Sequence, residues 1–186
     1  MSEGHATKYD PEGHVTKYDL MPLPPVEAHT AWFEAGPIAI GVEYRLLDDA
    51  IAAAAEKQAA VGSAGSAAAA ATGLDDRGVS LHVCGVEGGA RLEYLRFDCF
   101  QEDPHYHYVS WPTRMNHMLH LDPVAEGDPL AWALERIRTR LREMLGRAGA
   151  GELAARVDPR AIEAVLPKVA EAAARARALG SEAGAA

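Results

Sequence analysis

The clearest pattern in the chain is an alternation of apolar with small or charged side chains that begins after Pro37. Apolar residues stand at every second position from Ile38 to Leu46. A period of two is typical of a strand with one buried face. Segments 79–86 and 91–100 show similar strand-like patterns, and Gly88-Gly89 between them tolerates the positive φ angles of a tight hairpin turn. These patterns predict three antiparallel strands.

Two more strands and then helices are expected toward the C-terminus. Segment 105–111 alternates and is rich in aromatic residues, and segment 114–121 is a further strand candidate. Asp128-Pro129 and Asp158-Pro159 are helix-start signals, and each precedes apolar residues at helical spacing. An alanine-rich helix is also expected over 50–60. The prediction is an α+β fold, with an antiparallel sheet of four to five strands and helices packed mainly on one face as a two-layer sandwich.

The ends of the chain differ in composition from this central region. Residues 1–30 are expected to form an extended arm with a tandem nine-residue repeat, in which Glu3–Asp10 recurs as Glu12–Asp19. Residues 31–179 form the single domain, with 62–73 as a flexible Gly/Ser/Ala connection and 180–186 as a disordered tail. Two copies of one motif on a tether raise avidity, so residues 3–19 are a candidate docking site for a protein partner. The alternative is a duplication without a function.

The charge balance limits the classes of partner. The formal net charge is −9, which argues against binding to nucleic acid or to an anionic membrane. No apolar run approaches the ~18 residues of a membrane span, and the N-terminus lacks the pattern of a secretion signal. Two cysteines without CxxC spacing indicate neither a disulfide framework nor a zinc ribbon. A cytoplasmic protein is therefore expected.

Histidine is concentrated in one stretch of the chain, and this stretch carries the candidate chemistry. Four of the eight histidines fall between 105 and 120. In a strand His105 and His107 share a face, because side chains two apart point the same way. A four-residue turn at 101–104 would place Asp98 opposite His107 and on the same face. Two imidazoles and a carboxylate are ligand types of iron and zinc sites, so a divalent transition metal, iron or zinc, is the expected cofactor.

Other polar residues nearby are candidates for supporting roles. His117 and His120 could complete the ligand set, but both reach one face only if their segment departs from a regular strand. Asn116 and Asp122 could orient a ligand imidazole through its second nitrogen. Glu102 and Asp103, in the turn, are candidate ligands or general bases, and Asp103 and Glu102 are the catalytic residues expected here.

The element His105-Tyr106-His107 resembles the first metal-binding motif of the cupin superfamily, whose barrel strands hold iron, manganese or zinc with such pairs. In that family a glutamate and a glycine follow. This chain continues with Tyr108-Val109-Ser110-Trp111 and has few strands for such a barrel, so the resemblance covers only the histidine pair.

Two classes of function remain open from the sequence. The first is a small metal-dependent enzyme, a hydrolase, lyase or oxygenase, whose substrate pocket is walled by the aromatic residues Tyr94, Tyr106, Tyr108 and Trp111. A metal-free pocket with His107 or His117 as acid or base is a variant of it. The second is a non-catalytic accessory subunit or adaptor that docks through the repeated arm and the C-terminal helices, with the histidines as strand packing. A homo-oligomer is open in both.

Overall fold

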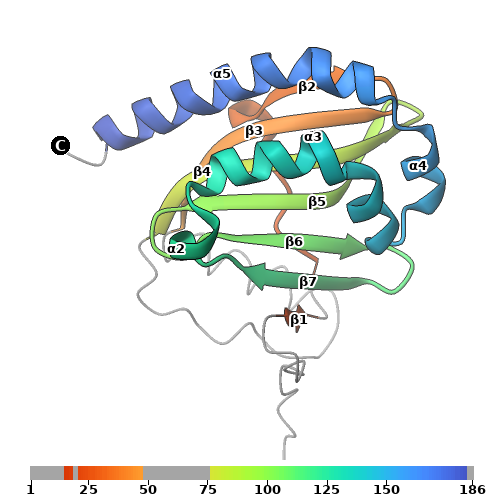
Figure 1. Ribbon diagram of the computed structural model, residues 1–186, viewed down its shortest axis with the longest axis horizontal. Helices are drawn as coiled ribbons and strands as arrows, with labels where there is room; N and C mark the ends of the chain where they lie inside the picture. The colour runs from red at the N-terminus through yellow and green to blue at the C-terminus, as the bar shows by residue number, and fades with distance from the viewer. Residues whose placement is uncertain (1–14, 19–20, 48–75, 184–186) are drawn as a thin grey trace, which may run out of the picture.

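The chain folds into one antiparallel sheet covered on one face by helices. A computed structural model describes residues 15–18, 21–47 and 76–183. All its strands belong to one seven-stranded sheet of order β1-β7-β6-β5-β4-β3-β2 (Figure 1). The strands are β1 Val15–Tyr18, β2 Ala31–Ala35, β3 Ile38–Leu47, β4 Asp76–Glu87, β5 Ala90–Phe100, β6 His105–Ser110 and β7 Met115–His120.

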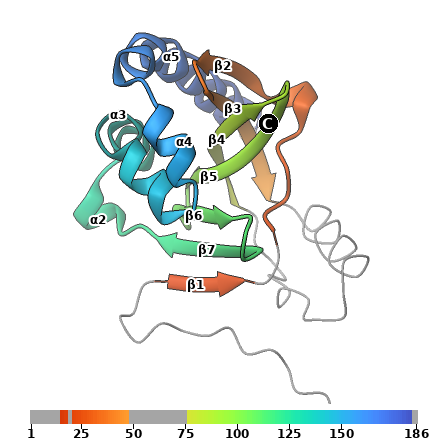
Figure 2. The ribbon, with the colours of Figure 1, turned by 90° about the vertical axis from the view of Figure 1, so that its right-hand side faces the viewer.

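The helices follow the sheet in the chain and lie together on one side of it, as Figure 2 shows. They are α2 Pro123–Glu126, α3 Pro129–Arg147, α4 Gly151–Arg156 and α5 Pro159–Ala183, and a short 3-10 helix, η1 Glu27–His29, precedes β2. The α+β class and the one-sided helix layer are therefore confirmed. No helix of the described residues is long and apolar enough to cross a membrane.

The sheet has more strands than the four to five expected. β2 was missed because Trp32 and Phe33 are adjacent apolar residues that break the alternation. β1 comes from the second copy of the N-terminal repeat and pairs with the edge strand β7, Val15 opposite Leu119. The backbone of a bare edge strand favours such pairing. The predicted helix over 50–60, the connection 62–73 and the first repeat copy lie outside the described residues.

The starts of α3 and α5 are those that the sequence predicted, whereas α2 and α4 were not predicted. The side chain of Asp128 accepts a hydrogen bond from the N–H of Ala131, 2.8 Å away, and so caps α3. α5 begins at Pro159, contains Pro167 and continues past Leu179 to Ala183, where a disordered tail was expected. At Gly180 the missing side chain lets α5 lie directly on the ring of Tyr44.

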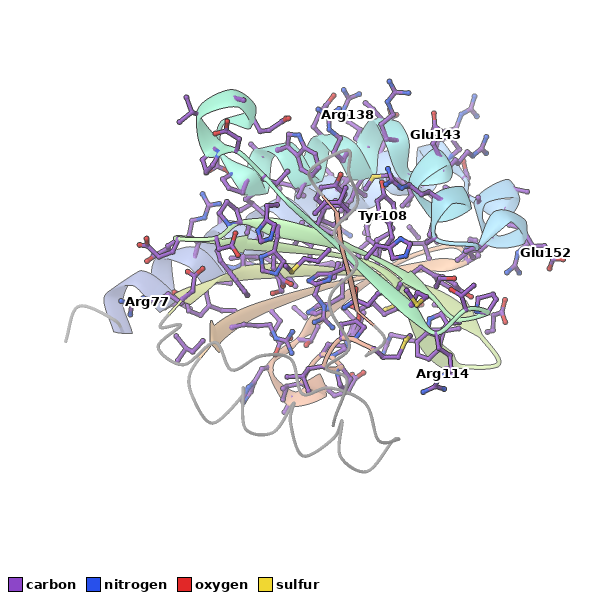
Figure 3. The ribbon with its side chains drawn as sticks, turned by 90° about the horizontal axis from the view of Figure 1, so that it is seen from below. Arg77, Tyr108, Arg114, Arg138, Glu143 and Glu152 are labelled. Atoms are coloured by element: carbon purple, nitrogen blue, oxygen red, sulfur yellow. The ribbon has the colours of Figure 1, made fainter. Side chains whose placement is uncertain are left out.

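The two faces of the sheet differ in chemistry. The face toward α3 and α5 carries the apolar core, including Ile40, Leu81 and Phe97, none more than 1% exposed. In Figure 3 Tyr108 points from the sheet toward the helix layer, and Arg138 and Glu143 lie on its outer side. The opposite face is also largely buried but polar, with charged or polar side chains from five neighbouring strands: Glu43, Arg45, Ser80, His82, Glu93, Arg96, Asp98, His107 and Asn116. We call it the polar face.

Candidate metal centre

Asp98, His105 and His107 come together on the polar face and form a group that could hold a metal ion. Each offers one ligand atom, and these atoms all lie within 4.8 Å of one another. The Oδ2 atom of Asp98 is 3.4 Å from Nε2 of His105 and 3.2 Å from Nε2 of His107. Both histidines thus direct the same ring nitrogen at one carboxylate oxygen.

The register that produces this group differs from the expected one by two residues. Asp98 lies opposite His105 and Arg96 opposite His107, whereas the sequence predicted Asp98 opposite His107. A shift of two keeps every side chain on its face, so the same three residues still converge. His107 is reached from Asp98 along the diagonal between neighbouring strands.

Asp76 explains the observed register. It is 2% exposed, and its carboxylate accepts backbone N–H groups from three consecutive turn residues: Gln101 at 3.0 Å, Glu102 at 3.1 Å and Asp103 at 2.9 Å. The turn between β5 and β6 is thereby tied to the start of β4. Sequence reasoning missed this residue, because its partners lie 25 to 27 positions away in the chain.

The second nitrogen of each histidine is held by an acceptor. Nδ1 of His107 is 2.9 Å from Oδ1 of Asn116, and Nδ1 of His105 is 2.7 Å from the backbone carbonyl of Asp103. A carbonyl oxygen only accepts, so both Nδ1 atoms carry the proton. In the neutral rings both Nε2 atoms therefore present lone pairs toward Asp98, which is the tautomer that metal ligation requires. The expected orienting role of Asn116 agrees with this contact.

Asp98 is oriented from its other oxygen. The hydroxyl of Ser80 on β4 donates to Oδ1 of Asp98, which leaves Oδ2 toward the histidines. Sequence reasoning missed Ser80, although the period of two that places it on one face with His82 was available as a signal. The three candidate ligands thus each have a second contact that fixes their direction.

The electrostatics of the group centre on Asp98. Burial alone would raise the pKa of Asp98, but contacts with His105 and His107 and the charge of Arg96 hold it well below its usual range. Burial lowers the pKa of His107. Burial also opposes the charged form of His105, but the contact with Asp98 outweighs it and raises the pKa of His105.

The remaining predicted residues lie outside this group. His117 pairs with Tyr108, so its side chain is on the helix-facing side of the sheet. His120 is on the same face as His105, with ring centroids 6.1 Å apart, but its Nδ1 contacts the carboxylate of Asp103 at 2.7 Å. Because β7 is a regular strand and the two positions differ by three, the side chains of His117 and His120 point to opposite faces of the sheet.

Asp103 and Glu102 do not face the Nε2 atoms. The carboxylate of Asp103 lies on the Nδ1 side of His105, 3.9 Å from that nitrogen, so the imidazole ring separates it from Asp98. Glu102 is exposed and donates its backbone N–H to Asp76. Asp122 accepts a hydrogen bond from the N–H of Val124 and caps α2. Asp103 thus lies in the β5–β6 turn and Asp122 at the start of α2, where each stabilises local structure.

A second polar cluster on the same face was missed by sequence reasoning. His82 is fully buried, with Nδ1 2.6 Å from Glu93 and Nε2 3.1 Å from Glu43. Arg96 contacts Glu93 at 2.7 Å and donates to the backbone carbonyl of Leu23. Arg96 also joins the two clusters, since its charge acts on Asp98.

We call Asp98, His105 and His107 the metal group. All three residues lie in the part of the chain that matches a known protein family. A family model described as a domain of unknown function (DUF7700) matches residues 32–173. The chain belongs to this family. No curated protein and no solved structure matches it. The matched DUF7700 region contains Asp98, His105 and His107 together with Ser80 and Asn116, so the candidate centre is part of the domain itself.

Proposed function

We propose that this DUF7700 protein is a metal-dependent enzyme whose ion is held by Asp98, His105 and His107. The observation that carries the proposal is the convergence of two Nε2 atoms on one carboxylate oxygen while acceptors hold both Nδ1 atoms. Two lone pairs and a carboxylate directed at each other repel unless a proton or a cation lies between them. Three protein ligands leave a coordination position for water or substrate, as in catalytic sites.

Of the two expected metals, we propose zinc. With metal–ligand bonds of about 2.0–2.1 Å, neighbouring ligand atoms are about 3.3–3.4 Å apart in a tetrahedron and about 2.9 Å apart in an octahedron. The two oxygen–nitrogen distances are 3.2 and 3.4 Å, close to tetrahedral edges. A bound zinc ion would supply a Lewis acid and a water that ionises near neutral pH, chemistry that suits hydrolases and lyases.

The chain's own residues would then have separate tasks. Ser80 holds Asp98 to one coordinating oxygen, because its hydroxyl occupies the other. Asn116 and the Asp103 carbonyl keep the protons of His107 and His105 on Nδ1. A ligand whose direction is fixed before binding loses little conformational entropy when the ion arrives.

Metal content is the direct test. Protein purified without a histidine tag is expected to carry about one zinc ion per chain by elemental analysis. His107→Ala and Asp98→Asn should lose the metal while circular dichroism shows the native fold. His29→Ala is the matched control, since His29 lies in η1 outside the group, and it should keep the metal. Protein that takes up no transition metal, or variants that retain it, would exclude the proposal.

An open coordination position separates an enzyme from a purely structural site. Replacement of zinc by Co²⁺ gives a visible spectrum that reports the ligand set. Azide should change this spectrum by binding at the fourth position, as expected of a catalytic site with three protein ligands. A spectrum that azide leaves unchanged would indicate a closed structural site and would contradict the enzymatic part of the proposal. An octahedral spectrum would favour iron.

A further inference from the structure

A cavity of about 270 Å³ lies on the polar face. Its lining includes Cys84, Glu93 and Val109 from the sheet and the two indoles of Trp32 and Trp111. The segment before η1 contributes its prolines to the lining. This segment is tied down by Arg96, which donates to the carbonyl of Leu23.

The cavity and the metal group share strand β6. Val109, which lines the cavity, is the next residue after His107 on the same face of this strand. Positions two apart in a strand are separated by about 6.6 Å along its axis. A ligand in the cavity therefore lies within the reach of one substituent from the candidate metal ligands.

The two indole walls are held in place by hydrogen bonds. Nε1 of Trp32 donates to the carboxylate of Glu27 at 2.9 Å, and Nε1 of Trp111 donates to the backbone carbonyl of Glu93 at 2.7 Å. The guanidinium of Arg91 lies 4.4 Å from the Trp32 ring centroid. Fixed aromatic walls bind a flat ring at little cost in side-chain entropy.

The polar groups at the cavity wall are already engaged with each other. The Glu93 carboxylate contacts His82 and Arg96, and burial raises the pKa of the Cys84 thiol, which keeps that thiol neutral. Arg91 pairs with Glu27 at 3.5 Å and covers one face of the Trp32 ring, so the surface offered to a ligand is the remaining indole surface and apolar carbon. An apolar cavity of about 150 Å³ holds benzene, so this one has room for a substituted ring or two fused rings.

We infer that this cavity binds a small planar aromatic molecule, with its ring against Trp32 and Trp111. The inference deepens the proposed function and rests on it in one respect: a substituent directed along β6 toward His107 would make the ring the substrate of the metal site. Trp111 was expected to wall a pocket from the sequence, whereas Tyr106 and Tyr108 pack on the helix side, where Tyr106 lies 5.1 Å from Trp132 between ring centroids.

Fluorine NMR with para-fluorophenol as the probe tests the cavity. The native full-length protein should broaden the probe signal, and phenol should displace the probe at least about tenfold more effectively than cyclohexanol, which has a ring of similar size but no flat face. Val109→Trp, which enlarges a side chain that lines the cavity from β6, should weaken probe binding by at least about tenfold. Val124→Trp adds the same indole at a 96% exposed site and should change binding less than about twofold.

A second variant keeps the test decisive if Val109→Trp does not fold. Trp111→Leu removes one wall and should also weaken the probe by about tenfold. An unbroadened probe, equal displacement by phenol and cyclohexanol, or full binding by both cavity variants would overturn the inference.

Metal loading separates this inference from the proposed function. Protein loaded with Mn²⁺ should relax the bound probe faster than protein loaded with Zn²⁺, because the ion lies close to the ring. If the two metals give the same relaxation, the cavity is not the substrate pocket of the site. If the protein takes up no metal, the proposed function fails, and the displacement by phenol still decides whether the cavity binds aromatic rings.

Discussion

The charge of Glu93 is expected to stabilise the fold, and the change Glu93→Gln removes it. Burial alone would raise the pKa of Glu93, but Arg96 and His82 outweigh burial and lower it from 4.5 to about 2. One pKa unit corresponds to about 1.4 kcal/mol, so the ionised carboxylate stabilises the folded state by about 3 kcal/mol at neutral pH. The side chain is 8% exposed, so solvent screens little of this energy.

The pH dependence follows from the direction of the change. A carboxyl group whose folded pKa is depressed stabilises the fold above its unfolded pKa of 4.5, and this stability is lost as the pH falls through about 2. At about pH 3 the unfolded chain has bound the proton and the folded chain largely has not, so about 2 of the 3 kcal/mol is gone. Glu93→Gln should be less stable than the natural chain by about 3 kcal/mol at neutral pH and by about 1 kcal/mol at pH 3.

Urea unfolding followed by circular dichroism at the two pH values measures this difference. Glu87→Gln is the control, because Glu87 is 70% exposed and pairs with Arg156 at the surface, where an ion pair contributes about 0–1 kcal/mol. Its stability difference should stay within about 1 kcal/mol at both pH values. A Glu93→Gln difference of equal size at both pH values would refute the reasoning, because it would show that the energy comes from packing instead of charge.

Three further changes test the support of the metal group and the packing of the sheet. Asn116→Ala should lower the affinity for Zn²⁺ by about 10–100-fold in a calorimetric titration without unfolding the protein, since it frees Nδ1 of the coordinating ring; unchanged affinity would contradict this role. Asp76→Ala leaves the backbone N–H groups of Glu102 and Asp103 in the β5–β6 turn without their acceptor and should cost about 2–4 kcal/mol in thermal unfolding, against about 1 kcal/mol for the exposed helix cap Asp122→Ala; equal costs would refute it. Gly78→Ala should destabilise by about 1–3 kcal/mol, because its Cβ would lie 2.7 Å from the Phe100 Cα atom. Gly146→Ala, with nothing within 4 Å, should be neutral or stabilising by up to about 1 kcal/mol, and the reverse order of these two would contradict the packing.

Much of the secondary structure could be predicted because its causes are local. The alternation from Ile38 to Leu46 specifies a strand with one apolar face, and Gly88 and Gly89 adopt φ angles of 58° and 83° in the hairpin turn. Asp128 caps α3 with its own side chain. Elements without such signals were missed: α4 begins at Gly151, after a residue that makes no side-chain cap.

The candidate metal group was predictable in part for the same reason. That His105 and His107 share a face depends only on the period of a strand. Asp98 joins them only if the register between β5 and β6 is shifted by an even number of residues from the expected one, because an odd shift would turn its side chain to the other face. The observed shift is two residues, so the predicted face of Asp98 is correct although the predicted pairing is not. His117 and His120 could not be assigned, because their side chains depend on whether β7 is regular over its whole length.

What the sequence by itself determined is the local part: the strand faces, the turns, the helix starts and the pair of histidines. Only the tertiary structure decided the polar face, because its contacts join strands that are far apart in the chain. Glu43 and His82 are 39 residues apart and meet at 3.1 Å, and Asp76 sets the β5–β6 turn from 27 residues away. Such contacts depend on the register between strands and on the segment before η1, which is bound to the polar face through Arg96. Neither leaves a periodic signal in the amino-acid sequence.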